Sequence, residues 1–539
     1  MDITLQIEQF GFPTPEHPYY HARLRLDAPP ADLTVTRVLV NAVRVRDFTV
    51  YSGGLANRKH TWAAGQPAEL VARVDWADGS TVRIAVQAED AAGARVELAA
   101  EGQTLAAGGW WDARWKYYGA TVLAETIGAA RAGEPVHLWL GLYADRLTDP
   151  AREIRVVGID PVSGQPQEVP SQVYGVSTWD KFADEHCQPT TTVGVAFLAD
   201  VPAHAQKVYL IFYGNPDAPA PAYPTDLRVS GSGLGLTVEN SHYTIRLHPD
   251  SGAIDEIHLK QNVNRVFAHH LETNGALHWN PGVYAPPRTW MHASDWNPPQ
   301  HAETIVGPVF AMTRRWGPLP DYPEVACSIT YLFYHNTPYV MESSVLDVTR
   351  DLDVVALRNG ELVVNQDVVD EFAWKQPDSA VGTVVIKTLP RHPVPAMEID
   401  ARAPWWAFFN RDVPCALAAI NLELSGMQHA DGLAQWEPYF YLHWGPWYYC
   451  ARPLVYTFIT PNPQRLIHVS AGSSYYERMA FYPCRLGNTD ADRFAPIEQT
   501  AARLFRPLRA GVVRLDTDAR VPEDWVPPIL VSEFEELED

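Results

Sequence analysis

Residues 278–296 concentrate side chains that can move protons, bind anions and stack on flat rings. The segment reads HWNPGVYAPPRTWMHASDW and contains three Trp, two His, one Tyr, one Arg and one Asp. Its prolines and glycine exclude a helix. The imidazole and phenol groups suit acid–base work, and an arginine can bind a carboxylate through two parallel hydrogen bonds. We therefore expect a loop that lines a ligand-binding groove.

A second segment, residues 437–453, has a similar content and reads EPYFYLHWGPWYYCARP. On a strand that ends near His443, the side chains of Glu437, Tyr439, Tyr441 and His443 share one face, because strand side chains alternate. Such a polar row is unusual for a core, where each buried polar group needs a partner. It is typical of a sugar-binding surface, and we expect the two segments to meet there.

Metal binding is an alternative use of the first segment. His278, His292, Asp295 and His301 could be the ligands, although their spacing matches no established metal motif. We expect no cofactor and keep a divalent metal as an alternative. Isolated cysteines without a C-x-x-C pair give no sign of a zinc site.

The elements that must position these residues are strands. The chain has 539 residues with 45 Pro and 34 Gly spread along it, which favours many short strands and turns over long helices. Apolar residues alternate with polar ones over most of the chain. We predict an all-β, multidomain protein with four parts: an N-terminal β-sandwich (1–107), a second β domain with a linker (108–226), a large two-layered supersandwich (227–490), and a helix, strand and acidic tail (491–539).

Charge and hydropathy limit the partners. The net charge is −22 and no run of Lys or Arg occurs, so we expect no nucleic acid. No stretch of eighteen apolar residues suggests a membrane span, and the N-terminal MDITLQIEQF lacks signal-peptide features. We expect a cytoplasmic protein, or a secreted one if a signal was removed. A homo-oligomer is possible.

One stretch resembles a known family. Residues 123–173, LAETIGAARAGEPVHLWLGLYADRLTDPAREIRVVGIDPVSGQPQEVPSQV, resemble the N-terminal RIFT-barrel domain of the rhamnogalacturonan exolyase (YetA-like) proteins. Those proteins continue into a galactose-mutarotase-like supersandwich, as residues 227 to about 485 would. The family's C-terminal α/α toroid is absent here and an extra N-terminal sandwich is present. The resemblance implies a RIFT-barrel-like fold for 108–226, carbohydrate handling and lyase chemistry.

We therefore expect a lyase that cleaves a uronate-containing glycoside in an acidic oligo- or polysaccharide by β-elimination. That reaction needs a base, an acid and a group that neutralises the sugar carboxylate. The candidates are His292 or His443 as base, Tyr284 or Tyr441 as acid, and Arg288 or Arg452 as carboxylate clamp. Substrate contacts are expected from Trp279, Trp290, Trp444, His278, His301, Glu437 and Tyr439.

Two other functions fit the same residues. A glycoside hydrolase would use paired carboxylates, for which Glu272, Asp295, Glu303 and Glu437 are available. A non-catalytic carbohydrate-binding protein would use the aromatic residues alone. The products separate the first from a lyase, because only a lyase leaves an unsaturated, ultraviolet-absorbing sugar.

Overall fold

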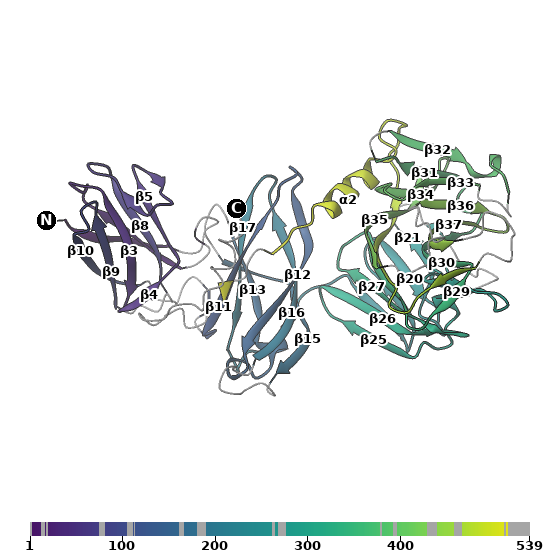
Figure 1. Cartoon of the computed structure of the whole chain (residues 1–539), viewed down its shortest axis with the longest axis horizontal. Coiled ribbons are helices and arrows are strands. Elements are labelled where there is room, and N and C mark those ends of the chain that lie inside the picture. The colour runs from purple at the N-terminus through teal and green to yellow at the C-terminus, as the bar shows by residue number, and fades with distance from the viewer. Residues whose placement is uncertain are drawn as a thin grey trace. The chain divides into compact units, whose positions relative to one another are not determined.

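Nearly every element of the chain is a strand (Figure 1), which confirms the expected all-β, multidomain fold. The helices are α1 (Pro150–Glu153) and α2 (Ala495–Phe505), with short 3-10 turns at Ala144–Arg146, Ala293–Asp295 and Ile386–Thr388. No helix in the described part of the chain is both long and apolar enough to cross a membrane. The computed structural model describes residues 3–11, 17, 20–74, 81–104, 111–112, 114–160, 166–179, 190–260, 265–267, 276–377, 380–391, 396–427, 439–456, 466–510 and 514–515.

The chain divides into two compact units. Unit 1 contains Met1–Ala132, Val136–Pro221 and Leu508–Asp539, and unit 2 contains Gly133–Pro135 and Ala222–Pro507. The chain therefore leaves unit 1 near the proline-rich stretch at 214–226 and returns to it after α2.

Unit 1 begins with two facing sheets that enclose an apolar core, in which Leu24, Val38, Trp62, Leu70 and Ile84 are fully buried. Alternating apolar residues on each strand supply this core, as the sequence pattern indicates. The first sheet has the order β1 (Leu5–Gly11), β2 (His21–Leu26), β8 (Ala68–Arg73), β5 (Phe48–Ser52), β6 (Leu55–Ala56). The second has the order β10 (Arg95–Gln103), β9 (Thr81–Asp90), β3 (Leu33–Val40), β4 (Val43–Val45), and β7 (Thr61–Trp62) pairs with β3.

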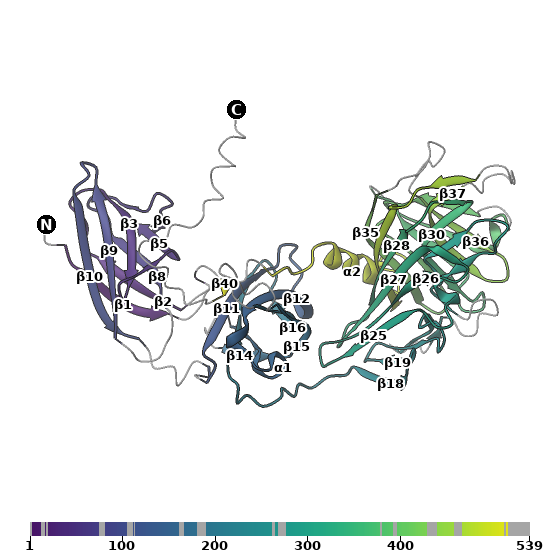
Figure 2. The same ribbon diagram turned by 60° about the horizontal axis from the view of Figure 1, so that its bottom comes forward.

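The other part of unit 1 also has two sheets (Figure 2), whose core includes Leu138, Val195, Phe197 and Ile211. Among the described strands the two sheets are not paired to each other, so the RIFT barrel implied by the family resemblance stays a prediction. One sheet has the order β14 (Pro166–Val169), β13 (Arg155–Ile159), β17 (Gln206–Tyr213), β11 (Tyr117–Ala124), β40 (Arg514–Leu515). The other has the order β12 (Arg131–Tyr143), β16 (Thr190–Val201), β15 (Ser171–Trp179).

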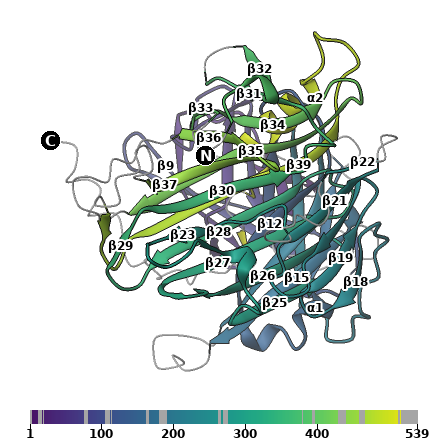
Figure 3. The same ribbon diagram turned by 90° about the vertical axis from the view of Figure 1, so that its right-hand side faces the viewer.

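Unit 2 (Figure 3) is built on a six-stranded and a nine-stranded sheet that share one large apolar core. The six-stranded sheet has the order β24 (Met291–His292), β23 (Gly282–Tyr284), β30 (Ala356–Val364), β37 (Tyr448–Tyr456), β36 (Tyr439–Trp444), β33 (Met397–Asp400). The nine-stranded sheet has the order β25 (His301–Val306), β26 (Phe310–Leu319), β27 (Tyr322–Tyr334), β28 (Val340–Val348), β39 (Ser474–Arg485), β35 (Cys415–Met427), β34 (Trp405–Asn410), β31 (Glu371–Lys375), β32 (Val381–Val385).

Two smaller sheets and the helix α2 complete unit 2. Ile497 and Ala501 of α2 are buried in a cluster with Trp405 and Tyr482, so the helix packs on the nine-stranded sheet. The small sheets are β18 (Arg228–Ser232), β19 (Gly235–Glu239), β20 (Tyr243–Leu247), β21 (Ile254–Leu259), β22 (Arg265–Val266), and the pair β29 (Leu352–Val354), β38 (Ile467–Val469).

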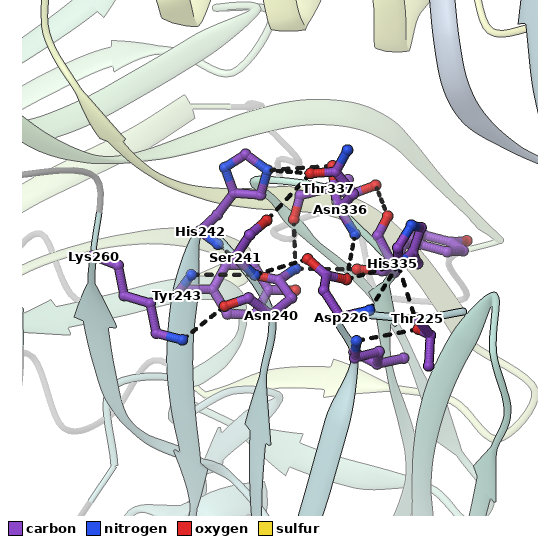
Figure 4. Close-up of polar contacts among 12 residues, drawn as sticks. Thr225, Asp226, Asn240, Ser241, His242, Tyr243, Lys260, His335, Asn336 and Thr337 are labelled. Carbon is purple, nitrogen blue, oxygen red and sulfur yellow. Dashed lines mark hydrogen bonds and ion pairs between the residues drawn. The ribbon is translucent and has the colours of Figure 1, made fainter.

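A polar cluster ties the five-stranded sheet of unit 2 to the turn between β27 and β28 (Figure 4). The carboxylate of Asp226 accepts hydrogen bonds from the backbone N–H groups of Ser241 at 2.8 Å and Asn336 at 2.9 Å. The side-chain amide of Asn240 donates to the carbonyl oxygen of Thr337 at 2.9 Å. The loops that begin this unit are therefore held by polar contacts as well as by the core.

The Asp226→Asn variant is expected to unfold with a weaker dependence on acid than the original chain. Burial raises the pKa of Asp226. The backbone donors of Ser241 and Asn336 and the nearby His335 lower it by more than burial raises it, so the net pKa lies below its usual value. A depressed pKa gives stability that is present above the unfolded-state value near 4 and is lost as the pH falls through the folded-state value. Urea midpoints at pH 7, 5 and 3 measure this. Asp250→Asn, at an exposed turn, is the control, and an unchanged acid profile in Asp226→Asn would contradict the assignment.

Candidate active site on the six-stranded sheet

The six-stranded sheet brings the two aromatic segments together. Strands β23 and β24 come from residues 278–296, and β36 and the first part of β37 come from residues 437–453. Strand β30 lies between them, pairing with β23 on one side and with β37 on the other. Both segments therefore contribute strands to one sheet, joined by a strand that neither segment contains, and a shared ligand-binding groove stays a prediction.

Alternation along β36 decides which side chains face the core. Phe440 and Leu442 are buried in the core shared with the nine-stranded sheet. Tyr441 and His443 therefore point to the opposite face, which we call the outer face. Both side chains are nevertheless buried, with 1% and 4% of their surface exposed.

Arg358 of β30 is at the centre of a hydrogen-bonded group on the outer face. Its Nη1 donates to the Oη of Tyr441 at 2.7 Å, and its Nη2 lies 2.9 Å from Nε2 of His292. A guanidinium only donates, so Nε2 of His292 is the acceptor and the ring proton is on Nδ1. That nitrogen lies 3.3 Å from a carboxylate oxygen of Asp295. The two segments are thus connected from Asp295 to Tyr441 through one arginine.

A bulge in β30 places a carboxylate beside this arginine. Asn359 is opposite Arg452 and Leu362 is opposite Cys450, so β30 has one residue more than β37 over this stretch. The extra residue is Gly360, whose φ of +58° is in the left-handed region. Leu362 faces the core, so Glu361 faces outward with Arg358, and their charged groups lie 3.2 Å apart.

Glu361 and the neighbouring phenols keep Arg358 charged. Burial lowers the pKa of the guanidinium, but the carboxylate of Glu361 and the rings of Tyr441 and Tyr449 raise it more, and the net pKa lies above its usual value. A guanidinium held in this way stabilises negative charge on the oxygen that it contacts. That oxygen is the phenol of Tyr441.

Aromatic rings surround the group, and those of Tyr284 and Trp290 are only half buried. The ring of Trp290 is stacked between Tyr284 and His292, with centroids 5.0 and 5.7 Å away. The guanidinium carbon of Arg358 lies 4.2 Å from the ring centre of Trp290. Trp279 adds a ring 5.6 Å from that of His292. Flat, partly exposed rings beside buried polar groups suit the binding of a sugar.

His443 is the second imidazole of the outer face. Its ring centre lies 5.3 Å from that of Tyr441 and 5.0 Å from that of Tyr449. The site therefore contains an imidazole and a phenol on the same strand, two residues apart, next to a guanidinium.

Several expected site residues lie elsewhere. Arg288 binds the carboxylate of Glu324 and the carbonyl oxygen of Asp321, each at 3.0 Å. Arg452 is fully buried between the sheets, where it donates to Asn421 at 2.6 Å. Neither expected carboxylate clamp belongs to the Arg358 group, since one pairs at the surface and the other faces the core.

The remaining expected contacts are also distributed. His278 bonds to the Oη of Tyr331 at 2.8 Å inside the core, where burial lowers its pKa to about 3. His301 stacks on Trp316 at the edge of the nine-stranded sheet. Trp444 donates to the carbonyl oxygen of Leu389. Tyr439 shares the outer face with Tyr441, and Glu437 lies outside the described residues.

Metal ligation has no cluster to support it in the part of the chain that the structure describes. There, no three His, Cys, Asp or Glu side chains are grouped as a metal ion would need. Asp295 and His292 are in contact, but the two ring nitrogens of His292 face the carboxylate of Asp295 and the guanidinium of Arg358. A metal ion at His292 would therefore have to displace one of these two groups.

Comparisons with known proteins give only weak structural similarities. No family model and no curated protein matches the chain. A protein in the glycosyl hydrolase family 38 from Enterococcus faecalis is similar over 74% of this chain and 48% of its own, with 11% identity and a TM-score of 0.42. An alpha-mannosidase from Enterococcus faecalis V583 gives 12% identity, 74% and 46% coverage, and the same TM-score. This chain spans about half the length of those two proteins. The periplasmic domain of Thermotoga maritima YidC is similar over 52% of this chain and 96% of its own, with 9% identity and a TM-score of 0.24.

Proposed function

We propose that the outer face of the six-stranded sheet binds a carbohydrate and cleaves it by β-elimination next to a uronate. The observation that carries the proposal is the hydrogen bond from Arg358 to the phenol of Tyr441, beside the half-buried, stacked rings of Tyr284 and Trp290. Polar groups at the centre can transfer protons, and partly exposed rings at the rim can stack on a sugar, so the arrangement suits acid–base chemistry on a carbohydrate.

Tyr441 is the proposed acid. Its oxygen accepts a hydrogen bond from Arg358, and its O–H is the donor that we assign to the leaving oxygen of the glycosidic bond. When that proton leaves, the guanidinium stabilises the phenolate that forms. Tyr284 is a weaker candidate for the acid, because its ring stacks on Trp290 and its described contacts include no bond to Arg358.

His443 is the proposed base. The lone pair of Nε2 in His292 is engaged by Arg358, so His292 is better suited to orienting the arginine than to accepting a proton. In the reaction His443 takes the proton from C5 of the uronate, and the C4–O bond breaks. The electron pair of the C–H bond forms the C4=C5 double bond, and Tyr441 protonates the departing oxygen.

The sugar carboxylate needs a donor, and Arg358 supplies one. Its buried Nε–H has no hydrogen-bond partner among the described residues, whereas Nη1 and Nη2 are engaged. This arginine replaces Arg288 and Arg452 as the proposed clamp. The resemblance of residues 123–173 to the rhamnogalacturonan exolyase (YetA-like) proteins implies the same lyase chemistry.

A glycoside hydrolase is the second candidate, because two carboxylates lie on the two sides of the Arg358–His292 pair. Asp295 contacts His292 and Glu361 contacts Arg358. Paired carboxylates are the groups that hydrolysis of a glycoside uses. Both are engaged in ion pairs or hydrogen bonds here, which favours a structural role for them, and we keep Tyr441 and His443 as the proposed reactive groups.

The test is a product assay with the full chain on oligosaccharides that contain uronate and on matched oligosaccharides without it. We expect new ultraviolet absorbance from an unsaturated uronate with the first set only. New reducing ends without that absorbance would favour the hydrolase. Tight binding without either product would contradict catalysis and favour a carbohydrate-binding protein.

A further inference from the structure

Unit 1 exposes a tryptophan on the face of a sheet. Trp139 of β12 has 58% of its surface exposed, and no other described Trp is exposed to that extent. Its neighbours Leu138 and Leu140 are buried in the core of this part of unit 1, so Trp139 points away from that core. A single exposed apolar side chain is ordinary, whereas an apolar patch rimmed by polar residues marks an interaction site, so the surroundings of this indole decide its meaning.

The rings of Trp139 and Tyr174 each lie against a glycine of a neighbouring strand. A Cβ at Gly175 of β15 would lie 2.7 Å from the indole of Trp139, so the indole rests on bare backbone. Tyr174 is opposite Gly194 of β16, and a Cβ there would lie 2.6 Å from the phenol ring. The two rings are 5.3 Å apart. They thus form a fixed aromatic surface that lies close to the strands.

Polar groups without charge surround the aromatic surface. Nδ1 of His137 lies 2.9 Å from the Oη of Tyr174, which fixes both side chains. Ser177 and Thr192 are paired across β15 and β16, and Thr190 lies two residues further along β16 on the same face. These hydroxyls lie on the side of the sheet that carries Trp139.

The charge of this face selects among ligands. Burial lowers the pKa of His137 to about 4 and raises that of Tyr174 to about 12, so both are uncharged at neutral pH. These two side chains are therefore uncharged, on a chain with a net charge of −22. An anionic polymer or a basic protein surface would find no charged group to pair with among Trp139, Tyr174 and the hydroxyls around them.

We propose that Trp139 and Tyr174 form a binding surface for a neutral saccharide. The apolar face of a pyranose ring packs on the indole, and hydroxyls of the sugar exchange hydrogen bonds with the surrounding Ser, Thr and His groups. The surface lies on β12, β15 and β16 of unit 1, whereas Tyr441 and Arg358 belong to unit 2. It binds sugar whether or not unit 2 is catalytic.

Affinity electrophoresis of the full chain tests this, in gels that contain a soluble neutral glucan, a soluble galactan, polygalacturonate or no polymer. We expect at least one neutral polymer to retard the original chain. The Trp139→Ala variant should bind that polymer at least about tenfold more weakly. Trp139→Phe keeps a ring and should bind with intermediate strength. Leu55→Ala removes another exposed apolar side chain of unit 1, at 76% exposure, and should bind as the original chain does.

Three results would overturn the proposal: retardation that Trp139→Ala does not reduce, no retardation by either neutral polymer, or concentration-dependent self-association that Trp139→Ala abolishes. The last would make this face a contact between copies of the chain. Retardation in the Tyr441→Phe variant separates the two proposals, because loss of turnover there should leave neutral-polymer binding unchanged. Binding through Trp139 without any turnover would remove the proposed lyase function and keep this surface.

Discussion

Replacing Tyr441 by Phe is expected to lower kcat/KM for β-elimination by about a thousandfold, within the range usual for loss of a general acid. The change removes one oxygen and keeps the ring, which is 1% exposed, so the outer face should stay packed. Arg358 loses the acceptor of its Nη1 and the leaving oxygen loses its proton donor. Initial rates of ultraviolet absorbance on a uronate oligosaccharide measure the effect, and circular dichroism shows whether the fold is kept.

Tyr284→Phe is the matched control for this variant. Tyr284 belongs to the same face and was the other phenol that the sequence suggested as the acid. Its ring stacks on Trp290, and a Phe ring can keep that contact, so we expect a loss of less than tenfold. If Tyr284→Phe has the larger effect, the roles assigned to the two phenols are reversed and the arginine-centred site is wrong.

The second large effect is expected from Gly360→Ala, which should destabilise unit 2 by about 3 kcal/mol or more. Gly360 has a φ of +58°, where any other residue is strained, and a Cβ there would lie 2.6 Å from a carboxylate oxygen of Glu477. Glu477 has little room to move, because it is fully buried and lies 3.5 Å from Arg452. Activity should fall as well, since the bulge is what places Glu361 beside Arg358.

Gly233→Ala separates backbone strain from the clash. Gly233 has almost the same φ, +59°, but no atom lies within 4 Å of its Cβ position. We expect it to cost only about 1 kcal/mol. Urea unfolding followed by tryptophan fluorescence compares the two variants. Equal costs would mean that Glu477 yields, and the buried pair beneath the bulge would then not fix the site.

Much of the architecture was predictable, because buried and less buried residues alternate in strands such as β20, β27 and β28. The hairpin around PDSG, residues 249–252, joins β20 to β21 as its turn residues indicate. The outward direction of the Tyr441 and His443 side chains also follows from the sequence, because the alternating residues Phe440 and Leu442 are apolar and belong to the core. The convergence of two distant segments was a reasonable expectation from their similar content.

The centre of the site was missed, because Arg358 lies in a strand that contains none of the anomalous aromatic content. The sequence of β30, ALRNGELVV, did contain an indication of the site, because two charged residues and an Asn-Gly pair interrupt an apolar run. Regular alternation would have put Arg358 and Glu361 on opposite faces, and only the extra residue of the bulge puts them on one. Conversely, Arg452 was predicted as a clamp because it lies near aromatic residues in the sequence. In the sheet it is opposite Asn359 of β30, and its side chain points into the core. Sequence gives composition near a site, whereas strand register decides which side chains reach it.

The path of the chain between the two units has a consequence for biosynthesis. Strand β40, at Arg514–Leu515, pairs with β11, at Tyr117–Ala124, although all of Ala222–Pro507 lies between them in the sequence. Unit 2 is therefore synthesised before the last described strand of that sheet, and until β40 is made the edge of β11 lacks this partner. A chain truncated just after α2 would contain the whole of unit 2 and a sheet of unit 1 that lacks one strand.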